Sequence, residues 1–321
     1  MQNFEYASPA SLKEALGLLG AQWGEADVLA GGTDLISLMK DEVHKPKRVV
    51  NIKGIKELGG IGKDKGGGMR IGSLVTFDEL LENRSIASEY PALVQAARGV
   101  SSPQIRNMGT VGGDLLQRPR CWYFRQGHGL LGQLNGKSLV PNGENRYHAI
   151  FPQGEAYFVS PSSLAPALIA LGAKVRLVSA SGPRDLEVEK LFVAPASNTD
   201  RETAIKPNEI LTEIILPAGR GVKSATYEVR EKQALDWPLA TASVAIAGGK
   251  TRIVMGHVGP TPVVATAAEQ LVSGKTLNAD LAEQAGQAAV QGAKPLSQND
   301  YKVTLAKVAV KRALLSASGL A

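Results

Sequence analysis

A strand that ends in two adjacent glycines and restarts as a helix constrains this chain more than any other feature of its sequence. The apolar run Val28–Ala30 predicts the end of a strand, Gly31-Gly32 and Thr33-Asp34 follow, and a new apolar pattern begins at Leu35. Glycine permits positive φ and close approach of the main chain to a ligand, and consecutive amides in such a turn can form an anion-binding nest. The segment fits a phosphate site, or an ordinary tight turn in which Thr33 or Asp34 caps the next helix.

A second glycine-rich segment follows later in the chain. Gly109 and the pair Gly112-Gly113 crowd together there, with Thr110 between them and Asp114 after them. This pattern suits neither a helix nor a plain strand, and it predicts another backbone turn of the same kind. Two such turns raise the expectation that both face one ligand with two phosphates. Arg106, just before the glycines, could supply charge to a phosphate or brace the loop.

At 321 residues the chain is long for a single core, and two or three domains are expected. A β/α unit is predicted over residues 1–57, before a run of glycines at 59–68 that marks a boundary. A second part spans 58–220 and contains an irregular insertion at 117–155. In the last part, 221–321, alternating strands precede helices, which is typical of a separate α+β domain.

Local patterns predict the individual elements. Ser8 and Pro9 are placed to cap and open a first helix, and Thr76 and Glu79 have the spacing of a capping box. Helices are predicted at 8–19, from 76, at 91–100, from 162, and near 263–273, 279–293 and 298–317. Strands are predicted at 28–30, 49–52, 69–72, 174–179 and 209–216, with an antiparallel meander at 225–230, 243–247 and 252–255.

Cys121 is the only cysteine, so no disulfide can form within the chain and the reducing cytoplasm is the expected compartment. It lies in a dense basic and aromatic cluster at the start of the insertion, and a loop of this length is usually functional or an interaction surface. Neighbouring arginines could lower the pKa of the thiol, but an inert or partly buried thiol is the preferred interpretation. The other members of the cluster are Arg118, Arg120, Trp122, Tyr123, Phe124 and Arg125.

Motifs for catalysis without a cofactor are absent from the sequence. It contains no nucleophile elbow, no P-loop and no Cys/His set with metal-ligand spacing, and its scattered histidines are interpreted as structural or surface residues. The net charge of +6 is dispersed and aromatic residues are only 5%, which argues against nucleic-acid binding. No segment approaches the roughly 20 apolar residues of a membrane span. A bound cofactor that carries the chemistry would explain this pattern.

With both glycine segments considered together, the chain resembles the FAD-binding (medium) subunit of the molybdenum hydroxylase family, which includes carbon monoxide dehydrogenase, xanthine dehydrogenase and 4-hydroxybenzoyl-CoA reductase. The resemblance runs almost end to end and rests on the order and spacing of several motifs. These are Ala30-Gly31-Gly32-Thr33-Asp34-Leu35, Ile71-Gly72, Arg106-Asn107-x-Gly109-Thr110-Val111-Gly112-Gly113-Asp114, Ser162-Ser163-Leu164 and Asp236-Trp237-Pro238-Leu239. It implies an α+β fold, in which a two-part FAD-binding domain of the PCMH or vanillyl-alcohol-oxidase type precedes a C-terminal domain of antiparallel sheet and helices.

The resemblance also implies how FAD is bound, non-covalently. In the family both glycine motifs hold the FAD pyrophosphate through backbone amides, and Leu211 stands where an apolar residue packs against the isoalloxazine ring. An Asp commonly contacts the flavin nucleotide where this chain has Ser163, so that contact is weaker or replaced. Arg230, Lys232 and Asp236 lie in the stretch that approaches the flavin. The predicted cofactor-binding residues are Ala30, Gly31, Gly32, Thr33, Asp34, Leu35, Arg106, Thr110, Gly112, Gly113, Asp114, Ser163 and Leu211; no metal ligand and no catalytic residue is assigned.

The function that the resemblance implies is electron transfer. FAD would receive electrons from a [2Fe-2S] partner subunit, which takes them from a molybdopterin-binding large subunit, and would pass them to NAD or dioxygen. The segment 117–125 is similar to a subgroup that carries an additional [4Fe-4S] cluster. Such a cluster needs about four thiolates and this chain has only Cys121, so no iron is expected here. A stand-alone flavin oxidoreductase and a non-catalytic nucleotide-binding protein are the alternatives.

Overall fold

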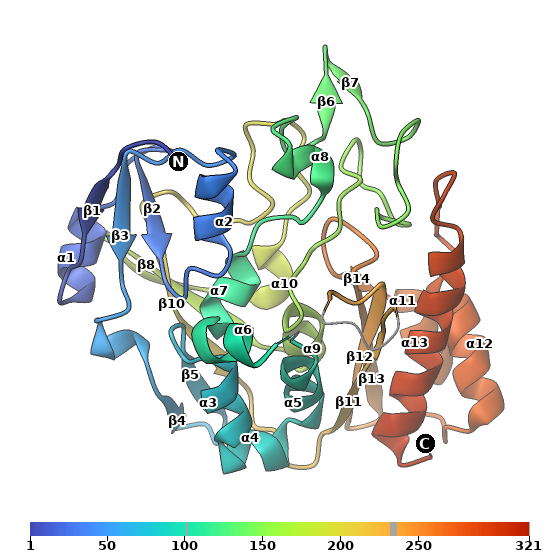
Figure 1. Cartoon of the computed structure of the whole chain (residues 1–321). Helices are drawn as coiled ribbons and strands as arrows, with labels where there is room; N and C mark the ends of the chain where they lie inside the picture. Colours follow the sequence, from blue (N-terminus) through green and yellow to red (C-terminus); the bar gives the residue numbers. More distant parts are fainter. Residues whose placement is uncertain (101, 232–235, 321) are drawn as a thin grey trace.

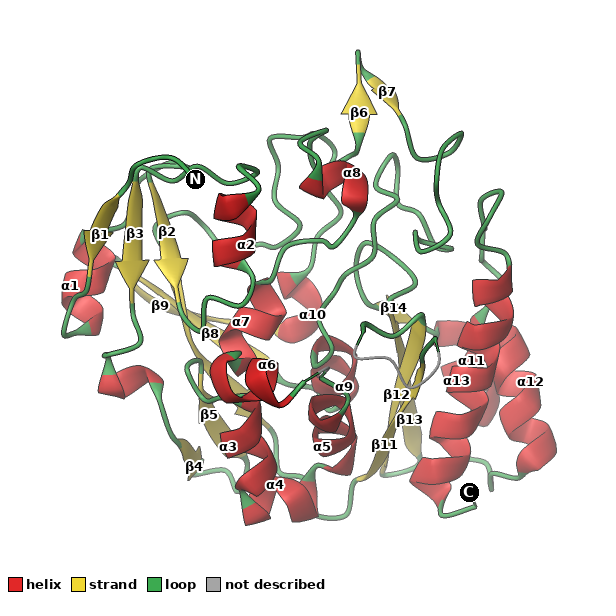
Figure 2. Ribbon diagram, in the orientation of Figure 1, coloured by secondary structure: helices red, strands yellow, loops and turns green. Residues whose placement is uncertain are grey.

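The computed structural model describes residues 1–100, 102–231 and 236–320. A small parallel sheet lies at one end of the molecule, an antiparallel sheet occupies the middle, and a second antiparallel sheet, backed by helices, forms the other end (Figures 1 and 2). The predicted α+β architecture, in which a C-terminal sheet and its helices follow a two-part unit, is thereby confirmed.

The N-terminal unit is a three-stranded parallel sheet in the order β1-β3-β2, with two short helices. Its first helix does not begin at Ser8 and Pro9 as predicted. It begins after Ser11, because the Ser11 hydroxyl accepts the amide of Glu14 at 3.3 Å. The elements are β1 (Glu5–Ala7), α1 (Leu12–Gly17), β2 (Ala26–Leu29), α2 (Leu35–Lys40) and β3 (Arg48–Asn51).

The middle sheet has five strands in the order β4-β5-β10-β8-β9, all antiparallel to their neighbours. The glycine-rich passage at 59–68, predicted to be a loop, contributes the edge strand β4. Residues 181–183 are not merely a turn, because β9 begins at Gly182 and extends the sheet. The strands are β4 (Ile61–Lys63), β5 (Met69–Gly72), β8 (Lys174–Ser179), β9 (Gly182–Glu187) and β10 (Ile210–Leu216).

Short helices cover the middle sheet and join it to the C-terminal sheet. The capping box of Thr76 and Glu79 is confirmed, with both reciprocal hydrogen bonds present at the start of α3. Helix α5 contacts β11, and α9 contacts β12 and β13. These helices are η1 (Lys56–Leu58), α3 (Phe77–Glu82), α4 (Arg84–Glu89), α5 (Pro91–Arg98), α9 (Ala165–Ala170) and α10 (Val188–Leu191).

The second glycine segment is helical, so the prediction of a non-helical turn there is wrong. Helix α6 (Pro103–Met108) leads into Gly109, and α7 (Val111–Leu116) contains both Gly112 and Gly113. Both helices are short and start at side-chain caps, since Ser102 accepts the amide of Ile105 and Thr110 accepts the amide of Gly113. In α7 the Thr110 cap offsets the low helix propensity of Gly112 and Gly113.

The insertion at 117–155 projects at the top of the view in Figure 1 and contains α8 (Trp122–Arg125), β6 (Gln133–Leu134) and β7 (Lys137–Ser138). Although mostly irregular, it has its own small core, in which Phe124 and Leu131 pack with Phe158 and with Leu38 of α2. The insertion therefore rests on the helix that follows the first glycine segment.

The C-terminal part confirms the predicted meander, whose strands pair antiparallel in the order β11-β12-β13-β14. Small residues let its helices pack closely; a Cβ on Gly286 would lie 2.6 Å from the Lys307 carbonyl oxygen. Within the described ranges, no helix is long and apolar enough to cross a membrane. The elements are β11 (Lys223–Val229), β12 (Ala240–Ala247), β13 (Lys250–Gly256), β14 (Val263–Val264), α11 (Thr266–Val272), α12 (Ala279–Ala289) and α13 (Tyr301–Ser318).

Candidate functional site

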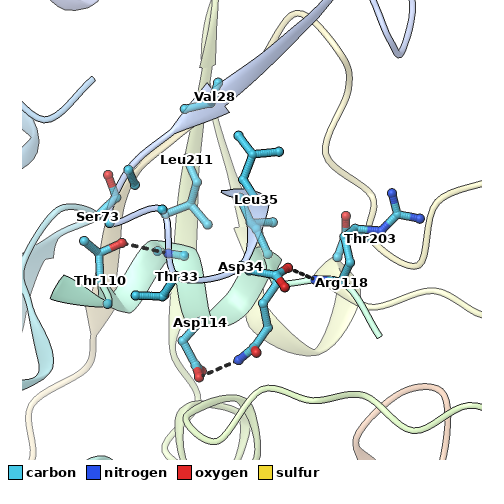
Figure 3. Close-up of a pocket in the computed structure, with 18 of the residues that line it drawn as sticks. Val28, Thr33, Asp34, Leu35, Ser73, Thr110, Asp114, Arg118, Thr203 and Leu211 are labelled. Atoms are coloured by element: carbon cyan, nitrogen blue, oxygen red, sulfur yellow. Dashed lines mark hydrogen bonds between the residues drawn. The ribbon is translucent and has the colours of Figure 1, made fainter. Parts of the chain in front are cut away.

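A cleft of about 310 Å³ lies where the N-terminal unit, the middle sheet, the insertion and the 236–238 loop meet. Concave sites of roughly 300–1,000 Å³ are typical of small-molecule and cofactor binding. The predicted cofactor-binding residues that line the cleft, several of which are drawn in Figure 3, are Ala30, Gly31, Gly32, Thr33, Asp34, Leu35, Thr110, Gly112, Gly113, Asp114, Ser163 and Leu211. The cleft thus joins motifs that are far apart in the sequence.

The first glycine segment offers backbone donors to this cleft. Among the described residues, no protein acceptor is found for the amides of residues 31–35, and the first helical bond of α2 is donated by Ile36 to the Gly32 carbonyl oxygen, at 3.2 Å. Gly32 has φ +78°, which glycine adopts without strain. Adjacent unpaired amides at the start of a helix favour an anionic group. Asp34 holds the N-cap position but makes no side-chain cap bond, so it does not act as an ordinary helix cap.

The glycines also let the two segments touch. A Cβ on Gly31 would lie 1.8 Å from the Met108 carbonyl oxygen, and a Cβ on Gly112 would lie 2.7 Å from Cβ of Ser73. At both positions glycine is required because a side chain would collide with another segment of the protein. The close approach expected between glycine and ligand is therefore, at Gly31 and Gly112, an approach between backbone segments that builds the cleft.

Most amides of the second segment are already used by the fold. Those of Val111 and Gly112 donate to the carbonyl oxygens of Val75 and Ser73, at 2.9 and 3.0 Å. The amide of Gly113 donates to the Thr110 hydroxyl at 3.1 Å. The expectation that both motifs offer rows of free amides is thereby corrected. The first segment presents such a row, whereas in the second segment only the Thr110 amide has no acceptor among the described residues.

Asp114 fixes the second segment to the turn before α9. Its carboxylate accepts the Ser162 hydroxyl at 2.5 Å and the amides of Ser163 and Leu164 at 3.2 and 3.0 Å, and Gln117 donates to it at 3.0 Å. Burial raises the pKa of Asp114 to about 6, although these hydrogen bonds oppose the rise. The carboxylate is thus committed to holding the walls together.

Arg106 lies outside the lining of the cleft. Its Nε donates to Asp78 Oδ1 at 3.1 Å and its Nη1 to the Val100 carbonyl oxygen at 3.2 Å. Of the two roles considered for this side chain, the structure supports bracing of α6 against α3, because the guanidinium is bound to protein acceptors on that side. The assignment of Arg106 as a cofactor-binding residue is therefore corrected.

Three polar side chains, in contact one after another, lie along one wall of the cleft. Asp27 Oδ2 lies 3.2 Å from His44 Nδ1, and His44 Nε2 lies 2.8 Å from Arg118 Nη1. Because arginine only donates, His44 Nε2 must accept and its ring proton belongs on Nδ1, facing Asp27. Arg118 also pairs with the buried Glu202. The histidine interpreted as structural from the sequence is therefore part of the cleft wall.

The C-terminal sheet reaches the cleft through the end of β11. Arg230 lines it, donating to the Gly99 carbonyl oxygen and, at 2.8 Å, to that of Asp236. Leu211 lines it from a β-bulge in β10 and is only 3% exposed. Arg230 and Asp236 thus lie where they were expected, whereas Lys232 falls outside the described residues.

Several lining residues were not predicted from the sequence. Arg118 and Arg120 belong to the basic and aromatic cluster of the insertion, which was the one available signal. The others reach the cleft through strand pairing or long loops that no local pattern reveals. They include Trp23, Ser73, Phe77, Arg201, Thr203 and Glu209.

Cys121 lies apart from the cleft, in a smaller cavity of about 170 Å³ beside it. Its Sγ is 3.2 Å from His148 Nε2. Burial raises the pKa of the thiol, and burial together with nearby Lys302 lowers the pKa of His148 to about 4. Over the part of the chain that the structure describes, no group of three or more His, Cys, Asp or Glu is placed to hold a metal ion. The inert thiol is the interpretation that these contacts support.

A glycine turn whose amides have no acceptor among the described residues, placed in a cleft between the N-terminal unit and the middle sheet, is typical of a protein that binds a nucleotide cofactor. Residues 2–219 match the family described as the FAD binding domain in molybdopterin dehydrogenase, and residues 225–317 match the CO dehydrogenase flavoprotein C-terminal domain. The chain belongs to this family of molybdopterin-dehydrogenase flavoproteins. The predicted resemblance, the FAD cofactor and the class of flavoprotein oxidoreductase component are confirmed.

Individual relatives cover nearly the whole chain. The aldehyde oxidoreductase FAD-binding subunit PaoB of Escherichia coli K12 is 31% identical over 288 residues, 88% of each chain. The carbon monoxide dehydrogenase medium chain of Hydrogenophaga pseudoflava is 28% identical over 323 residues, covering 98% of this chain and 96% of that one. A solved structure of carbon monoxide dehydrogenase from the same organism, lacking the Mo-pyranopterin moiety, has a TM-score of 0.77 at 28% identity and covers 99% of this chain.

Proposed function

We propose that this chain is the FAD-binding electron-transfer subunit of a molybdopterin-dependent hydroxylase or dehydrogenase. In the proposed path, electrons pass from an iron–sulfur subunit through FAD to an acceptor. The observation that carries the proposal is the row of amides at residues 31–35, which have no acceptor among the described residues and belong to a segment that lines the cleft together with the second glycine segment. The relatives named as FAD-binding subunit and medium chain support it.

The residues of the cleft fit the parts of FAD. The amides of 31–35 suit the pyrophosphate, since each offers an N–H to an anionic oxygen. Thr110 and Gly113 form the facing wall, and Leu211 offers the apolar surface that the family resemblance places beside the flavin ring. Ser163 has little left to offer a ligand through its amide, which donates to Asp114. When bound, FAD supplies the redox chemistry, and the protein positions it and controls access to it.

The proposal includes partners and organisation. The partners are a [2Fe-2S] small subunit and a molybdopterin-binding large subunit, with NAD or dioxygen as acceptor and the cytoplasm as compartment. Within the chain we assign residues 1–57 and 58–220 to the two FAD-binding subdomains and 221–321 to the C-terminal domain. The substrate of the complex would be selected by the large subunit.

The test of electron transfer combines the FAD-loaded chain with the proposed iron–sulfur and molybdopterin-binding subunits. Under anaerobic conditions, the reduced iron–sulfur subunit should bleach the visible absorbance of the oxidised flavin, and the later addition of NAD or dioxygen should restore it. Copurification of the three subunits is also expected. A chain that binds FAD, forms no complex and oxidises a small molecule by itself would support the stand-alone oxidoreductase instead.

A further inference from the structure

The carboxylate of Asp34 faces the insertion, not the open part of the cleft. Its Oδ2 accepts the backbone amide of Arg118 at 2.7 Å, as drawn in Figure 3, and its Oδ1 accepts Arg125 Nη2 at 2.7 Å. Arg120 Nη2 lies 3.3 Å from the same Oδ1. The Asp34 side chain is 16% exposed and that of Arg125 is 14% exposed, so the interaction is largely removed from water.

Arg125, which binds Asp34, also binds the backbone of the insertion. Its Nε donates to the Pro119 carbonyl oxygen at 2.9 Å and its Nη2 to that of Arg118 at 3.1 Å. Its Nη1 lies 3.4 Å from the Ser37 hydroxyl of α2. One guanidinium therefore holds the turn at 118–119 and attaches it to the helix that follows the first glycine segment.

The segment held in this way forms a wall of the cleft. Gln117, Arg118 and Arg120 line it, and within the described residues Arg125 lies behind that lining. The Arg120 guanidinium lies over the Trp237 ring, 4.3 Å from the ring centroid. The wall therefore continues from the first glycine segment, through the insertion, to the loop of the C-terminal part.

We propose that Asp34 is a positioning residue and not a cofactor ligand: it docks residues 117–125 of the insertion against the first glycine segment and so sets the arginine wall of the cleft. This inference rests on the proposed FAD function. A lone carboxylate beside amides that bind a pyrophosphate would repel it, whereas Asp34 is matched by two guanidinium groups. The acidic residue is compatible with an anion site because the insertion neutralises it.

The substitution Asp34→Asn separates a positioning role from that of a bystander carboxylate. A positioning role predicts that the dissociation constant for FAD rises at least tenfold, because the buried Arg125 loses its anionic partner and the wall of the cleft is no longer held in place. A bystander carboxylate predicts tighter FAD binding, since a negative charge is removed. Asp41→Asn, at the exposed C-terminal end of the same helix, is the matched control and should leave FAD binding unchanged.

A double-mutant cycle with Arg125→Gln distinguishes positioning from direct ligation. Since Arg125 does not line the cleft, its substitution should weaken FAD binding only through the wall, and the double variant should be no worse than either single one. Additive losses, or an Arg125→Gln variant with normal FAD affinity, would overturn the proposal. A variant with a lowered melting temperature but normal FAD affinity and flavin spectrum would also overturn it.

Amide hydrogen exchange tests the contact between Asp34 and the insertion without FAD. In the FAD-free chain, Asp34→Asn should speed amide exchange in residues 117–125, because the Arg118 amide and Arg125 are then left with one acceptor oxygen in place of two. If the unaltered chain takes up no FAD, the proposed function fails, and faster exchange would still report the Asp34 contact. If FAD binds but exchange in 117–125 is unchanged by the substitution, the positioning role of Asp34 is wrong.

Discussion

The backbone of Gly31 lies directly against the carbonyl group of Met108. A Cβ on Gly31 would be 1.8 Å from that oxygen and 3.2 Å from the Gly109 Cα, so only glycine fits. This contact closes the first glycine segment onto the end of α6 and brings the two segments to one cleft.

Gly31→Ala is therefore expected to destabilise the chain and to abolish FAD uptake. Forcing an atom into a packed backbone contact costs ~1–3 kcal/mol or more, and here the contacting atom cannot rotate away. Thermal unfolding and flavin content measure both effects. Gly54→Ala is the control, because nothing lies within 4 Å of its Cβ, and an equal loss in both variants would contradict the assignment.

Gly112→Val and Gly32→Val should also lose FAD, for different reasons. The valine at position 112 meets Ser73, while the valine at position 32 is strained because that residue has φ +78°. Equilibrium dialysis with FAD at a temperature where both variants are folded measures the loss. Unchanged affinity in the folded variants would show that these backbone positions do not shape the site.

The sequence indicated which segments line the cleft, but it did not indicate the hydrogen bonds and helices within them. The two glycine segments, Leu211 and the stretch near Asp236 were found because motif order is visible in the chain. The helical state of Gly112 and Gly113 was not, because the cap at Thr110 outweighed the low helix propensity of glycine. The partners of Asp34 and Arg106 are many residues away, and charge pairing over such separations leaves no local pattern.

Asp114 should give the chain a characteristic pH dependence. Its pKa is raised by burial from 3.8 to about 6, so between these values the folded state holds a proton that the unfolded state has lost. Stability should therefore fall as pH rises from about 4 to about 6. Asp114→Asn should remove this part of the slope. Chemical denaturation at several pH values measures it, and identical slopes in both proteins would contradict the burial of this carboxyl.

Because of Lys302, the stability of the folded chain is expected to change in the opposite direction at higher pH. Burial lowers its pKa from 10.5 to about 7, so between these values only the unfolded state keeps the proton and stability should rise with pH. Lys302→Met should flatten that rise. It should also cost roughly 1–3 kcal/mol, because the carbonyl oxygens of Tyr147, His148 and His257 lose the donor that binds them at 3.2, 3.1 and 2.8 Å. Exposed Lys250→Met serves as the control and should keep the slope of the unaltered chain.

The isolated chain is expected to contain no iron. A [4Fe-4S] cluster needs about four thiolates, and Cys121 is the single cysteine. Iron analysis and the visible spectrum of the anaerobically purified chain should show flavin alone, unchanged by Cys121→Ser. Stoichiometric iron that the substitution removes would contradict this expectation.

Titration of the purified, flavin-free chain with FAD is the decisive test of cofactor binding at the first glycine segment. The predicted result is saturable, non-covalent binding of one FAD per chain, released intact on denaturation and competed by ADP, because the amides of residues 31–35 recognise the pyrophosphate. A chain that is folded by circular dichroism and takes up no FAD would contradict the account.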